Sequence, residues 1–302
     1  MPMTPVVSRL AAGAAVEAVS LINRVFVASR ARSGHIVDRY PHVFGPESDS
    51  VVLAGVDAGR TVGAVVVRPV ESINSVTGVR LRGGMVGFVC TAEGRRGEGI
   101  STALLAAARV HMRESGMQFG VLWTTIQSFY ERIGWRAVDH SQLGLRSGPR
   151  SCQEEGETQP GIQVPAREAD AEWLERLRLE WCRDRVPRAA VDYRVVPPAA
   201  DDVLCVADQQ GEGYALVGVA PSRAFLYELV GSPTCFPRLW PTVASLRGEL
   251  MVNTHPGQCS YSYLRGLDGI IWSAQHQAMW VSDGGVDPAI LDRLYFSFAD
   301  RI

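Results

Sequence analysis

The sequence predicts a mixed α/β fold, with α-helices on mixed β-sheets, arranged as two domains in tandem. The chain has 302 residues, enough for two domains of about 100 to 200 residues each. A polar stretch rich in Gly, Pro, Ser and Glu, QLGLRSGPRSCQEEGETQPG, interrupts the apolar pattern over 142–161 and indicates a linker. The order helix, three strands, helix, strands occurs on both sides of it. We therefore place the first domain at 1–145, the linker at 146–163 and the second domain at 164–302.

The first domain is expected to contain antiparallel strands followed by one β-α-β unit. A helix is predicted over 11–31, and alternating or continuous apolar runs then predict the strands VVLAGVD, TVGAVVVRPVES and GGMVGFVCT. A helix from Ile100 to Glu114 follows, because Ile100, Leu104, Leu105, Ala108 and Met112 recur at helical spacing. The strand GMQFGVLWTT, the short helix SFYERIG and the strand WRAV complete this domain.

The second domain repeats this order of elements without similarity at the residue level. Its first helix lies in AREADAEWLERLRLEWCRDR, and three strands follow in VLCVADQ, GYALVGVA and AFLYELVG. We then expect a helix over 233–246, the strands ELMVNTH and GIIWSAQHQAMWVS, and a last helix in DPAILDRLYFSFADRI.

The composition excludes several classes of function. All 30 basic residues are arginine, so the lysine required by P-loop nucleotide sites, protein kinases and pyridoxal phosphate enzymes is missing. The formal net charge of -2 gives no polybasic field, so neither nucleic acid nor a membrane is expected as a partner.

Cysteine and histidine spacing argues against a metal site. The chain has no CxxC, HxxxH or HExxH pattern, so no metal cofactor is expected. The six cysteines are dispersed as in a reduced protein, and no segment reaches about 18 consecutive apolar residues. The N-terminus lacks the pattern of a signal peptide. These observations favour a cytoplasmic location.

The stretch TAEGRRGEGISTALL, residues 91–105, joins a predicted strand to a predicted helix. A strand, a glycine-rich turn and a helix form a general phosphate-binding device, because the first helical N–H groups have no partners in the helix. The Rossmann fingerprint would need a third glycine where Thr102 stands. The segment from Arg96 to Ser101, RGEGIS, instead fits the pattern R/Q-x-x-G-x-G/A, with Ser101 in place of Gly or Ala.

That pattern resembles the coenzyme A signature of the GCN5-related N-acetyltransferases. Residues 50–138 carry further similarity in the right order, since VGFVCTAEG resembles the family's fourth strand, GVLWTT its fifth, and SFYERIGWR its YExxGF segment. The resemblance implies that these two strands splay apart and admit the pantetheine arm of acetyl-CoA. Both domains are then expected to have this acetyltransferase-like fold, with the second one degenerate.

The resemblance also implies roles for individual residues. Backbone groups of Val89 and Thr91 would pair with the pantetheine arm, and an N–H near Val89 or Cys90 would bind the oxyanion. Further cofactor contacts are expected from N–H groups along Arg96, Gly97, Glu98, Gly99, Ile100 and Ser101, and from Thr125 at the end of the fifth strand. Arg95 and Arg96 either add charge beside the pyrophosphate or remain solvated loop residues.

Catalytic and acceptor residues are less sharply indicated. Tyr130 aligns with the tyrosine that many family members use as general acid toward sulfur, and the alternative is that it only packs under the cofactor. His35, Asp38 and His42 lie in the region that roofs the acceptor pocket, and each has the alternative of a surface or packing role. No general base stands out.

The tandem arrangement resembles the enhanced intracellular survival family, whose first copy binds acetyl-CoA, more than mycothiol synthase, whose second copy is active. Here the cofactor motif is in the first copy, and ELVGSPTCFPRLW in the second has no R-x-x-G-x-G. The sequence departs from the former family in stopping without its sterol-carrier-like third domain. The second copy is expected to form a wall of the acceptor pocket or an interface of a homo-oligomer.

The sequence thus predicts an acetyl-CoA-dependent N-acetyltransferase that acetylates a primary amine of a small molecule by direct attack in a ternary complex. One alternative is an acyltransferase that uses a longer acyl chain or a hydroxyl acceptor. Another is a non-catalytic acyl-CoA sensor or scaffold.

Overall fold

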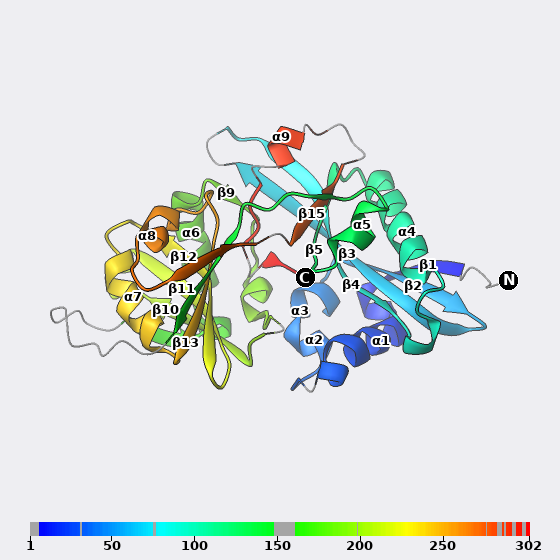
Figure 1. The fold of residues 1–302 in the computed structure, drawn as a ribbon, viewed down its shortest axis with the longest axis horizontal. Coiled ribbons are helices and arrows are strands. Elements are labelled where there is room, and N and C mark those ends of the chain that lie inside the picture. The colour runs from blue at the N-terminus through cyan, green and yellow to red at the C-terminus, as the bar shows by residue number, and fades with distance from the viewer. Residues whose placement is uncertain are drawn as a thin grey trace.

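The chain folds into two lobes, each built around a mixed β-sheet, and its last residues lie between them (Figure 1). The computed structural model describes residues 6–30, 32–74, 77–147, 161–197, 199–275, 277–282, 286, 288–291, 294–297 and 300–302. Most of the predicted linker, residues 148–160, lies outside the described residues.

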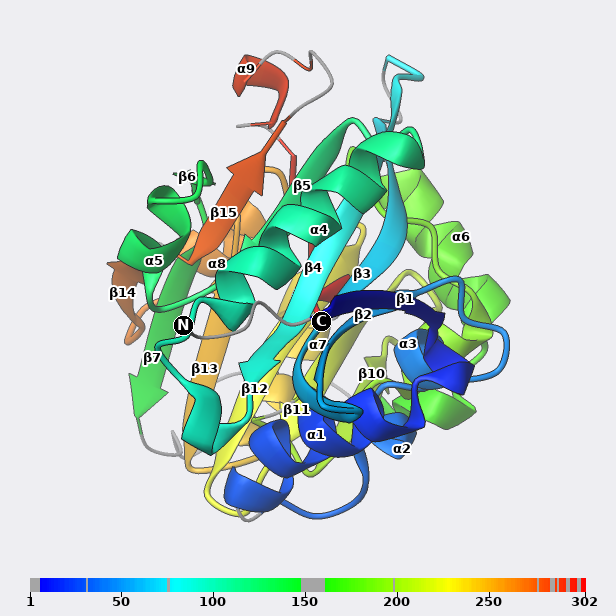
Figure 2. The same ribbon diagram turned by 90° about the vertical axis from the view of Figure 1, so that its right-hand side faces the viewer.

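The first sheet has the strand order β1-β2-β3-β4-β5-β15-β6, with β9 paired to β3. All neighbours are antiparallel except β4 and β5, which are parallel (Figure 2). The strands are β1 (Val6–Ala11), β2 (Val51–Asp57), β3 (Arg60–Asn74), β4 (Arg80–Thr91), β5 (Phe119–Trp123), β6 (Arg136–Ala137), β9 (Asp184–Arg185) and β15 (Ala278–Val281).

The second sheet repeats this plan with the order β14-β7-β13-β12-β11-β10-β8. Its single parallel pair is β12 with β13. The strands are β7 (Gln142–Ser147), β8 (Ile162–Pro165), β10 (Asp202–Ala207), β11 (Gly213–Val219), β12 (Arg223–Gly231), β13 (Glu249–Thr254) and β14 (Ile271–Ala274).

Each lobe donates a strand to the sheet of the other. Strand β7 from the first half lies between β13 and β14, and β15 from the second half lies between β5 and β6 (Figures 1 and 2). The predicted linker, 146–163, therefore needs correction at both ends, because β7 continues to Ser147 and β8 begins at Ile162. The segment GIIWSAQHQAMWVS, predicted as one strand, forms β14 and β15 in different sheets. Each sheet therefore contains strands from both sides of the predicted domain boundaries at 145 and 164.

Helices cover both faces of each sheet, because the buried side chains of successive strand residues alternate between two cores. In the first lobe α4 packs on one face and α1 to α3 on the other; in the second lobe these places are taken by α7 and α6. The α-helices are α1 (Val16–Phe26), α2 (Ile36–Arg39), α3 (Pro41–Phe44), α4 (Ile100–Glu114), α5 (Gln127–Glu131), α6 (Ala171–Trp181), α7 (Phe236–Ser245), α8 (Tyr261–Arg265) and α9 (Pro288–Leu291).

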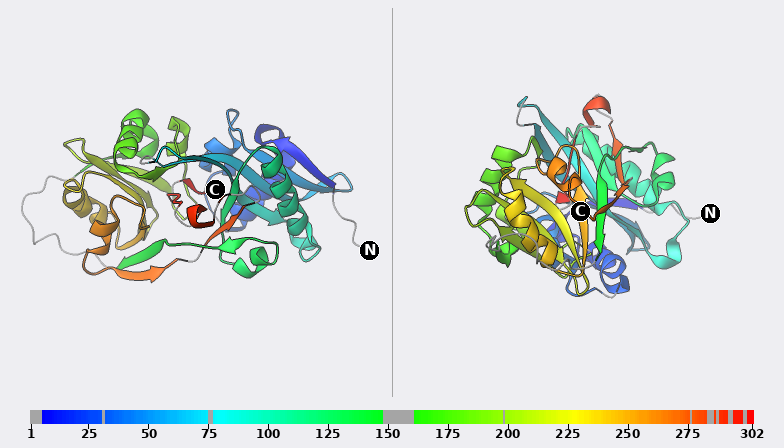
Figure 3. Two further views of the ribbon diagram at one scale, coloured as in Figure 1. Left: turned by 90° about the horizontal axis from the view of Figure 1, so that it is seen from above. Right: turned by 60° about the vertical axis from the view of Figure 1, so that its left-hand side comes forward.

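Two further predictions of secondary structure need correction. The predicted helix over 11–31 is shorter, and β1 precedes it as an edge strand. The predicted α-helix at the end of the chain is limited to α9. Residues 294–297 follow without helix or strand pairing, and 300–302 lie near the centre of the molecule (Figure 3). Both regions take their form from contacts with distant strands, which local periodicity does not encode. No helix among the described residues is long and apolar enough to cross a membrane.

Candidate active site

Strands β4 and β5 separate after three residue pairs. The ladder joins Gly83 to Phe119, Gly84 to Gly120 and Met85 to Val121, while β4 continues to Thr91. Beyond Met85 no strand in the described part of the chain pairs with the β5-facing edge of β4. Main-chain N–H and C=O groups on a buried strand need partners, so this edge is ready to accept an extended ligand. The splay expected from the family resemblance is present.

A β-bulge in β4 lies at this separation. The register with β3 shifts between Ala64 and Val66, and Phe88 has a φ of 52°, which is uncommon for a residue with a Cβ. The Phe88 ring packs edge-on against Phe26 and Tyr40, with centroid distances of 5.5 and 5.0 Å. This aromatic packing holds the bulge, and the bulge turns the end of β4 away from β5.

The turn between β4 and α4 has the conformation that the glycines were expected to supply. Gly97 and Gly99 have φ values of 84° and 78°, a region that favours glycine, and Gly99 is the N-cap of α4. A Cβ on either glycine would meet no atom within 4 Å, so open space adjoins the turn. Because Gly99 has no capping side chain, the first N–H groups of α4 face that space. The geometry fits an anion at the start of a 15-residue helix.

The side chains around the turn are arranged differently from the sequence expectation. The Arg95 guanidinium forms ion pairs with Asp57 and Glu98, each at 2.7 Å, so its charge is already balanced within the loop. Arg96 is exposed. The Ser101 hydroxyl, which replaces the expected Gly or Ala, lies 2.8 Å from the Thr91 hydroxyl. Ser101 therefore ties the first turn of α4 to the end of β4.

Tyr130 lies beneath the separated strands. It is 7% exposed and packs in the same apolar core as Leu104 and Leu105 of α4, and Val89 of β4 packs against that core. Burial raises the pKa of its phenol to about 12, so the hydroxyl keeps its proton at neutral pH. Both predicted uses of Tyr130, as an acid and as a packing residue, remain predictions.

The other predicted cofactor positions differ in what their side chains can offer. Cys90 is 4% exposed and points into the core with α1, and burial raises the pKa of its thiol to about 12. Ile100 is 1% exposed, so only its main chain is available at the turn. Thr125 is exposed in the bend between β5 and α5.

Only one of the three predicted acceptor-side residues reaches the interior. His35 is exposed at the N-cap of α2 and accepts a hydrogen bond from the Val37 N–H, and Asp38 is exposed. His42 is 6% exposed, and neither of its ring nitrogens has a hydrogen-bond partner. Burial lowers the pKa of its imidazole well below the usual value, and the positive charges of Arg68 and Arg188 lower it further. The structure thus separates His42 from the other two.

The end of the described chain reaches the separated strands. A Cβ on Gly87 would lie 2.8 Å from the main-chain carbonyl of Ile302, so glycine is required for this approach. Ile302 packs both against the core that contains Phe88 and against the one that contains Trp280. The residues from Tyr295 to Ile302 that the structure describes therefore extend from the second lobe to the opening in the first.

A buried network of charges holds this segment. The Glu228 carboxylate on β12 accepts hydrogen bonds from Tyr214 at 2.9 Å and Ser297 at 3.0 Å, and it pairs with Arg188 at 2.8 Å and Arg178 at 3.2 Å. Burial would raise the pKa of Glu228, but the two guanidinium groups outweigh it and hold the value at about 2.

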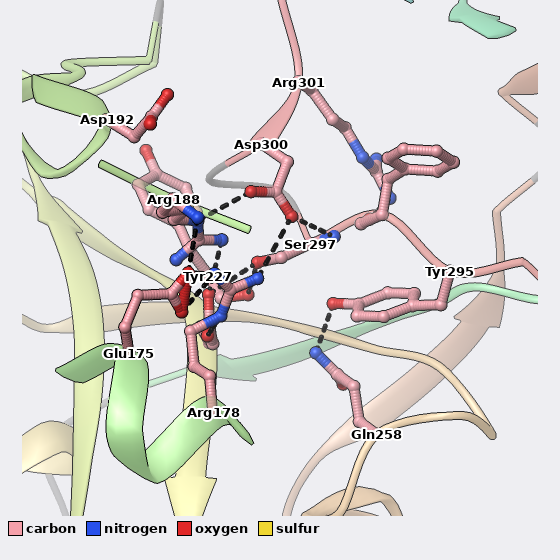
Figure 4. A network of polar contacts seen from close by, with 12 residues as sticks. Glu175, Arg178, Arg188, Asp192, Tyr227, Gln258, Tyr295, Ser297, Asp300 and Arg301 are labelled. Carbon is pink, nitrogen blue, oxygen red and sulfur yellow. Dashed lines mark hydrogen bonds and ion pairs between the residues drawn. The ribbon is translucent and has the colours of Figure 1, made fainter. Parts of the chain in front are cut away.

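Asp300 completes the network. It pairs with Arg188 at 2.6 Å and accepts the Ser297 N–H at 3.1 Å (Figure 4). This cluster was not predicted from the sequence. Its one signal was Glu228 itself, an acidic residue within the apolar run AFLYELVG, because a buried charge requires a partner.

The second lobe has the same strand separation, but its own side chains fill it. The β12–β13 ladder ends at the pair Leu226 and Val252. Beyond it the Ser297 hydroxyl donates to the Tyr227 carbonyl at 3.5 Å, and the Cys259 thiol donates to the Leu229 carbonyl at 3.7 Å. The edge of β12 is therefore partly occupied.

The start of α7 also lacks an anion site. Pro237 in its first turn has no N–H to donate. The Glu212 carboxylate accepts hydrogen bonds from Ser232 and Thr234, both at 3.3 Å, and from Arg238 at 2.6 Å. A carboxylate thus stands beside this helix start, consistent with the missing glycine motif.

A cavity of about 1050 Å³ lies between the lobes. It is bounded by the β3–β4 hairpin, the residues that follow α6, the turn after β13 and the region of α9. Its polar and aromatic lining includes Asn74, His140, Trp181, Arg183, Asp184, His255 and Gln258. His140, His255 and Leu294 also line a smaller cavity that contacts Trp123 at the end of β5 and Arg301. The two cavities therefore share part of their lining, and the smaller one adjoins the end of β5.

No cluster of three or more His, Cys, Asp or Glu side chains suited to a metal occurs within the described ranges.

Comparison with known proteins agrees with this geometry. Residues 7–138 match the family model of the acetyltransferase (GNAT) domain. No curated protein matches the chain in sequence. Among solved structures, the chain is similar to a conserved protein of unknown function from Enterococcus faecalis V583, a probable N-acyltransferase. That pair shows 14% identity over 93% of this chain and 73% of the other, with a TM-score of 0.69.

Two further solved structures are similar to this chain over most of its length. Eis1 from Mycobacterium abscessus is 15% identical over 81% of this chain and 67% of its own, with a TM-score of 0.55. A tandem GNAT protein from the clavulanic acid biosynthesis pathway is 15% identical over 93% of this chain and 99% of its own, with a TM-score of 0.58. At these identities the likeness is one of fold. Residues 7–138 thus match an acetyltransferase (GNAT) domain, and the chain as a whole shares its fold with a solved tandem GNAT protein.

Proposed function

We propose that this protein is an acetyl-CoA-dependent N-acetyltransferase that acetylates a primary amine of a small molecule. The observation that carries the proposal is the separation of β4 from β5 directly ahead of a turn with two left-handed glycines, Gly97 and Gly99. The first feature suits an extended pantetheine arm, and the second suits a pyrophosphate.

The residues present fit coenzyme A. Main-chain groups of Val89 and Thr91 would pair with the arm, and the N–H groups from Arg96 to Ser101 would bind the phosphates. The open space beside Gly97 and Gly99 leaves room for those phosphates. Arg96, exposed beside the turn, adds a positive charge there, whereas Arg95 shapes the loop through Asp57 and Glu98.

The bound cofactor supplies an acetyl thioester, and the chain supplies orientation and a proton. An N–H group at Val89 or Cys90 would bind the thioester carbonyl oxygen, a role in which one donor contributes about 2.7 to 4 kcal/mol. The protonated Tyr130 hydroxyl would donate its proton to the departing sulfur. Cys90 does not serve as a nucleophile, because its thiol is buried and its pKa is raised. Direct attack by the amine in a ternary complex follows.

The acceptor would enter through the interlobe cavity. Its volume of about 1050 Å³ accommodates a small molecule, and its lining combines aromatic groups such as Trp181 with polar ones such as Asp184 and Gln258. The second copy would then serve as a wall of the acceptor pocket.

The experiment that tests this function is thiol release from acetyl-CoA across a panel of aminoglycosides, polyamines, amino acids and amino sugars. We expect amine-dependent release and an acetylated product for at least one acceptor class. Calorimetry with coenzyme A in parallel distinguishes the alternatives. Binding without turnover on any acceptor would identify a sensor or scaffold, and turnover only with longer acyl-CoA would identify a different acyl donor.

Replacing Tyr130 by Phe tests the proton donor. The ring would keep its packing against Phe129 and Trp135, so coenzyme A affinity should change little. We expect kcat to fall by about 100- to 10,000-fold, the usual range for general acid catalysis. An unchanged kcat would leave Tyr130 with its packing role alone.

A further inference from the structure

Two cysteines far apart in sequence meet beside the interlobe cavity. Cys182 is the C-cap residue of α6, and Cys259 lies in the turn between β13 and α8. Their thiols are in hydrogen-bond contact, and neither forms a disulfide. Both side chains line the same small cavity, together with Glu228 and Asp300 of the charge network.

The environment makes the two thiols chemically unequal. The hydrogen bond between them raises the pKa of Cys182, and burial raises it further. The same bond lowers the pKa of Cys259 against the effect of burial, and the main chain at Gly231 contributes in the same direction. Cys259 is therefore the better nucleophile, and Cys182 lies next to it as a second thiol.

An oxidant can reach Cys259. Besides the small cavity, Cys259 lines the interlobe cavity of about 1050 Å³, whose rim includes the exposed residues Val79 and Ile290. Cys205 and Cys235, by contrast, are fully buried and line neither of these cavities.

We propose that Cys182 and Cys259 form a redox pair that hydrogen peroxide closes into a disulfide. The Cys259 thiolate attacks hydrogen peroxide, its sulfur takes up one oxygen as a sulfenic acid, and the O–O bond breaks to release hydroxide, which the proton lost from the thiol converts to water. The Cys182 sulfur then attacks the sulfenic sulfur, and the S–O bond breaks to release a second water. In total two thiols are oxidised, one hydrogen peroxide is reduced, and two waters form.

The bond would join two walls of the interlobe cavity. Cys182 stands between Trp181 and Arg183, and Cys259 follows Gln258, and all three neighbours line that cavity. Gln258 in turn donates to the Tyr295 hydroxyl and accepts the His255 N–H at 3.1 Å. Closing the pair would draw these residues together and change the shape of the cavity. The expected effect on turnover rests on the proposed function, because it requires the acceptor to enter there.

Peptide mapping of the intact protein tests the bond without reference to activity. Because the chain has no lysine, trypsin cleaves only at arginine and yields separate peptides 179–183 and 248–265 that carry Cys182 and Cys259. After hydrogen peroxide treatment we expect these peptides to be linked and to be released by dithiothreitol. The Cys152→Ser variant, which lacks a thiol outside the pair, should give the same link. Absence of the link in the oxidised wild-type protein would overturn the proposal.

Variants assign the two roles. In Cys182→Ser, a dimedone adduct should accumulate on Cys259, whereas Cys259→Ser should give no adduct on Cys182; the reverse pattern would contradict the assigned order. With an acceptor identified by thiol release, oxidation should raise its KM by about fivefold, the effect of one lost hydrogen bond, and leave coenzyme A affinity unchanged. A link without this KM change would refute the effect on the cavity while leaving the redox pair in place.

Discussion

The two lobes contain the same parallel strand pair, yet only one of them keeps it open. In the first lobe the edge of β4 beyond Met85 leads to Gly97 and Gly99 at the start of α4. In the second, the edge of β12 is bonded to Ser297 and Cys259. The sheet topology alone therefore does not make a cofactor site. The few residues at the strand edge and at the helix start decide it.

The difference is also electrostatic. The start of α4 presents unpaired N–H groups to open space, which favours an anion. Beside the start of α7 the Glu212 carboxylate accepts hydrogen bonds from Ser232, Thr234 and Arg238, so the donors there are already used. A phosphate would have to displace a carboxylate that is bonded to three groups. The start of α7 is thereby unsuited to binding a phosphate.

Separating the lobes should have the largest effect on the protein. A fragment of residues 1–147 lacks β15, which leaves an edge of β5 unpaired and removes the burial of Met279, Trp280 and Val281. That burial contributes about 5 kcal/mol or more, comparable to the whole stability of a typical domain. We expect the fragment to be insoluble or unfolded by circular dichroism.

A cut in the connection is the matched control. With a protease site placed within residues 148–160, cleavage should leave both fragments together on gel filtration, with the thermal transition nearly unchanged. The reason is that β7 stays in the second sheet and β15 in the first. A folded fragment 1–147 that still binds coenzyme A would show that the strand exchange is dispensable.

Substitution at the turn of the first lobe should have the next largest effect. Gly99→Val places a β-branched side chain at a φ of 78°, which costs about 1 to 2 kcal/mol locally, and its methyl groups enter the open space. Loss of two charge-assisted hydrogen bonds should lower coenzyme A affinity more than about 100-fold by calorimetry. Gly248→Val, at an equally open position ahead of β13, should leave affinity unchanged. Equal affinity in the two variants would refute the assigned phosphate position.

The first lobe could be predicted largely from sequence because its determinants are local. The α4 helix is found at its predicted bounds from Ile100 to Glu114, and the glycine turn precedes it as expected. Helical spacing and glycine conformation are properties of neighbouring residues, so one sequence reveals them. The roles of Arg95 and Ser101 were less visible, because their partners Asp57 and Thr91 are set by the fold.

The second lobe and the connections were predicted less well for the same reason. Strand β15 joins the first sheet because it pairs with the edge of β5. The local sequence before Ala278 does not indicate which sheet this strand will join. The C-terminal residues were predicted as helix from their apolar spacing, but Asp300 and Ser297 are held by Arg188 and Glu228 from distant elements. Contacts between residues so far apart in the sequence can be identified only from the structure.

The smallest effect concerns the buried histidines, His255 in the second lobe and His42 and His111 in the first. Burial lowers the pKa of His255 to about 4; the nearby Asp139 acts in the opposite direction, and His140 and Arg301 reinforce the shift. Its Nδ1 accepts the Gly257 N–H at 2.9 Å, so the neutral ring is bonded in the fold. Above pH 6.5 the ring is neutral in both folded and unfolded chains, and it has no effect on pH dependence. Between pH 6.5 and pH 4 mainly the unfolded chain takes up the proton, so the free energy of unfolding falls as the pH is lowered toward 4.

At pH 5 the loss from His255 amounts to about 2 kcal/mol by this linkage. We expect urea unfolding to show it between pH 7 and 5, with His42 of the first lobe adding a loss in the same direction. His255→Asn keeps an acceptor for the Gly257 N–H but cannot be protonated, so it should flatten the profile by about that amount. His140→Gln, at an exposed histidine beside it, should not. If both variants retained the full wild-type slope, the acid sensitivity would have to be assigned to His42 and His111 in the first lobe, and His255 would contribute none of it.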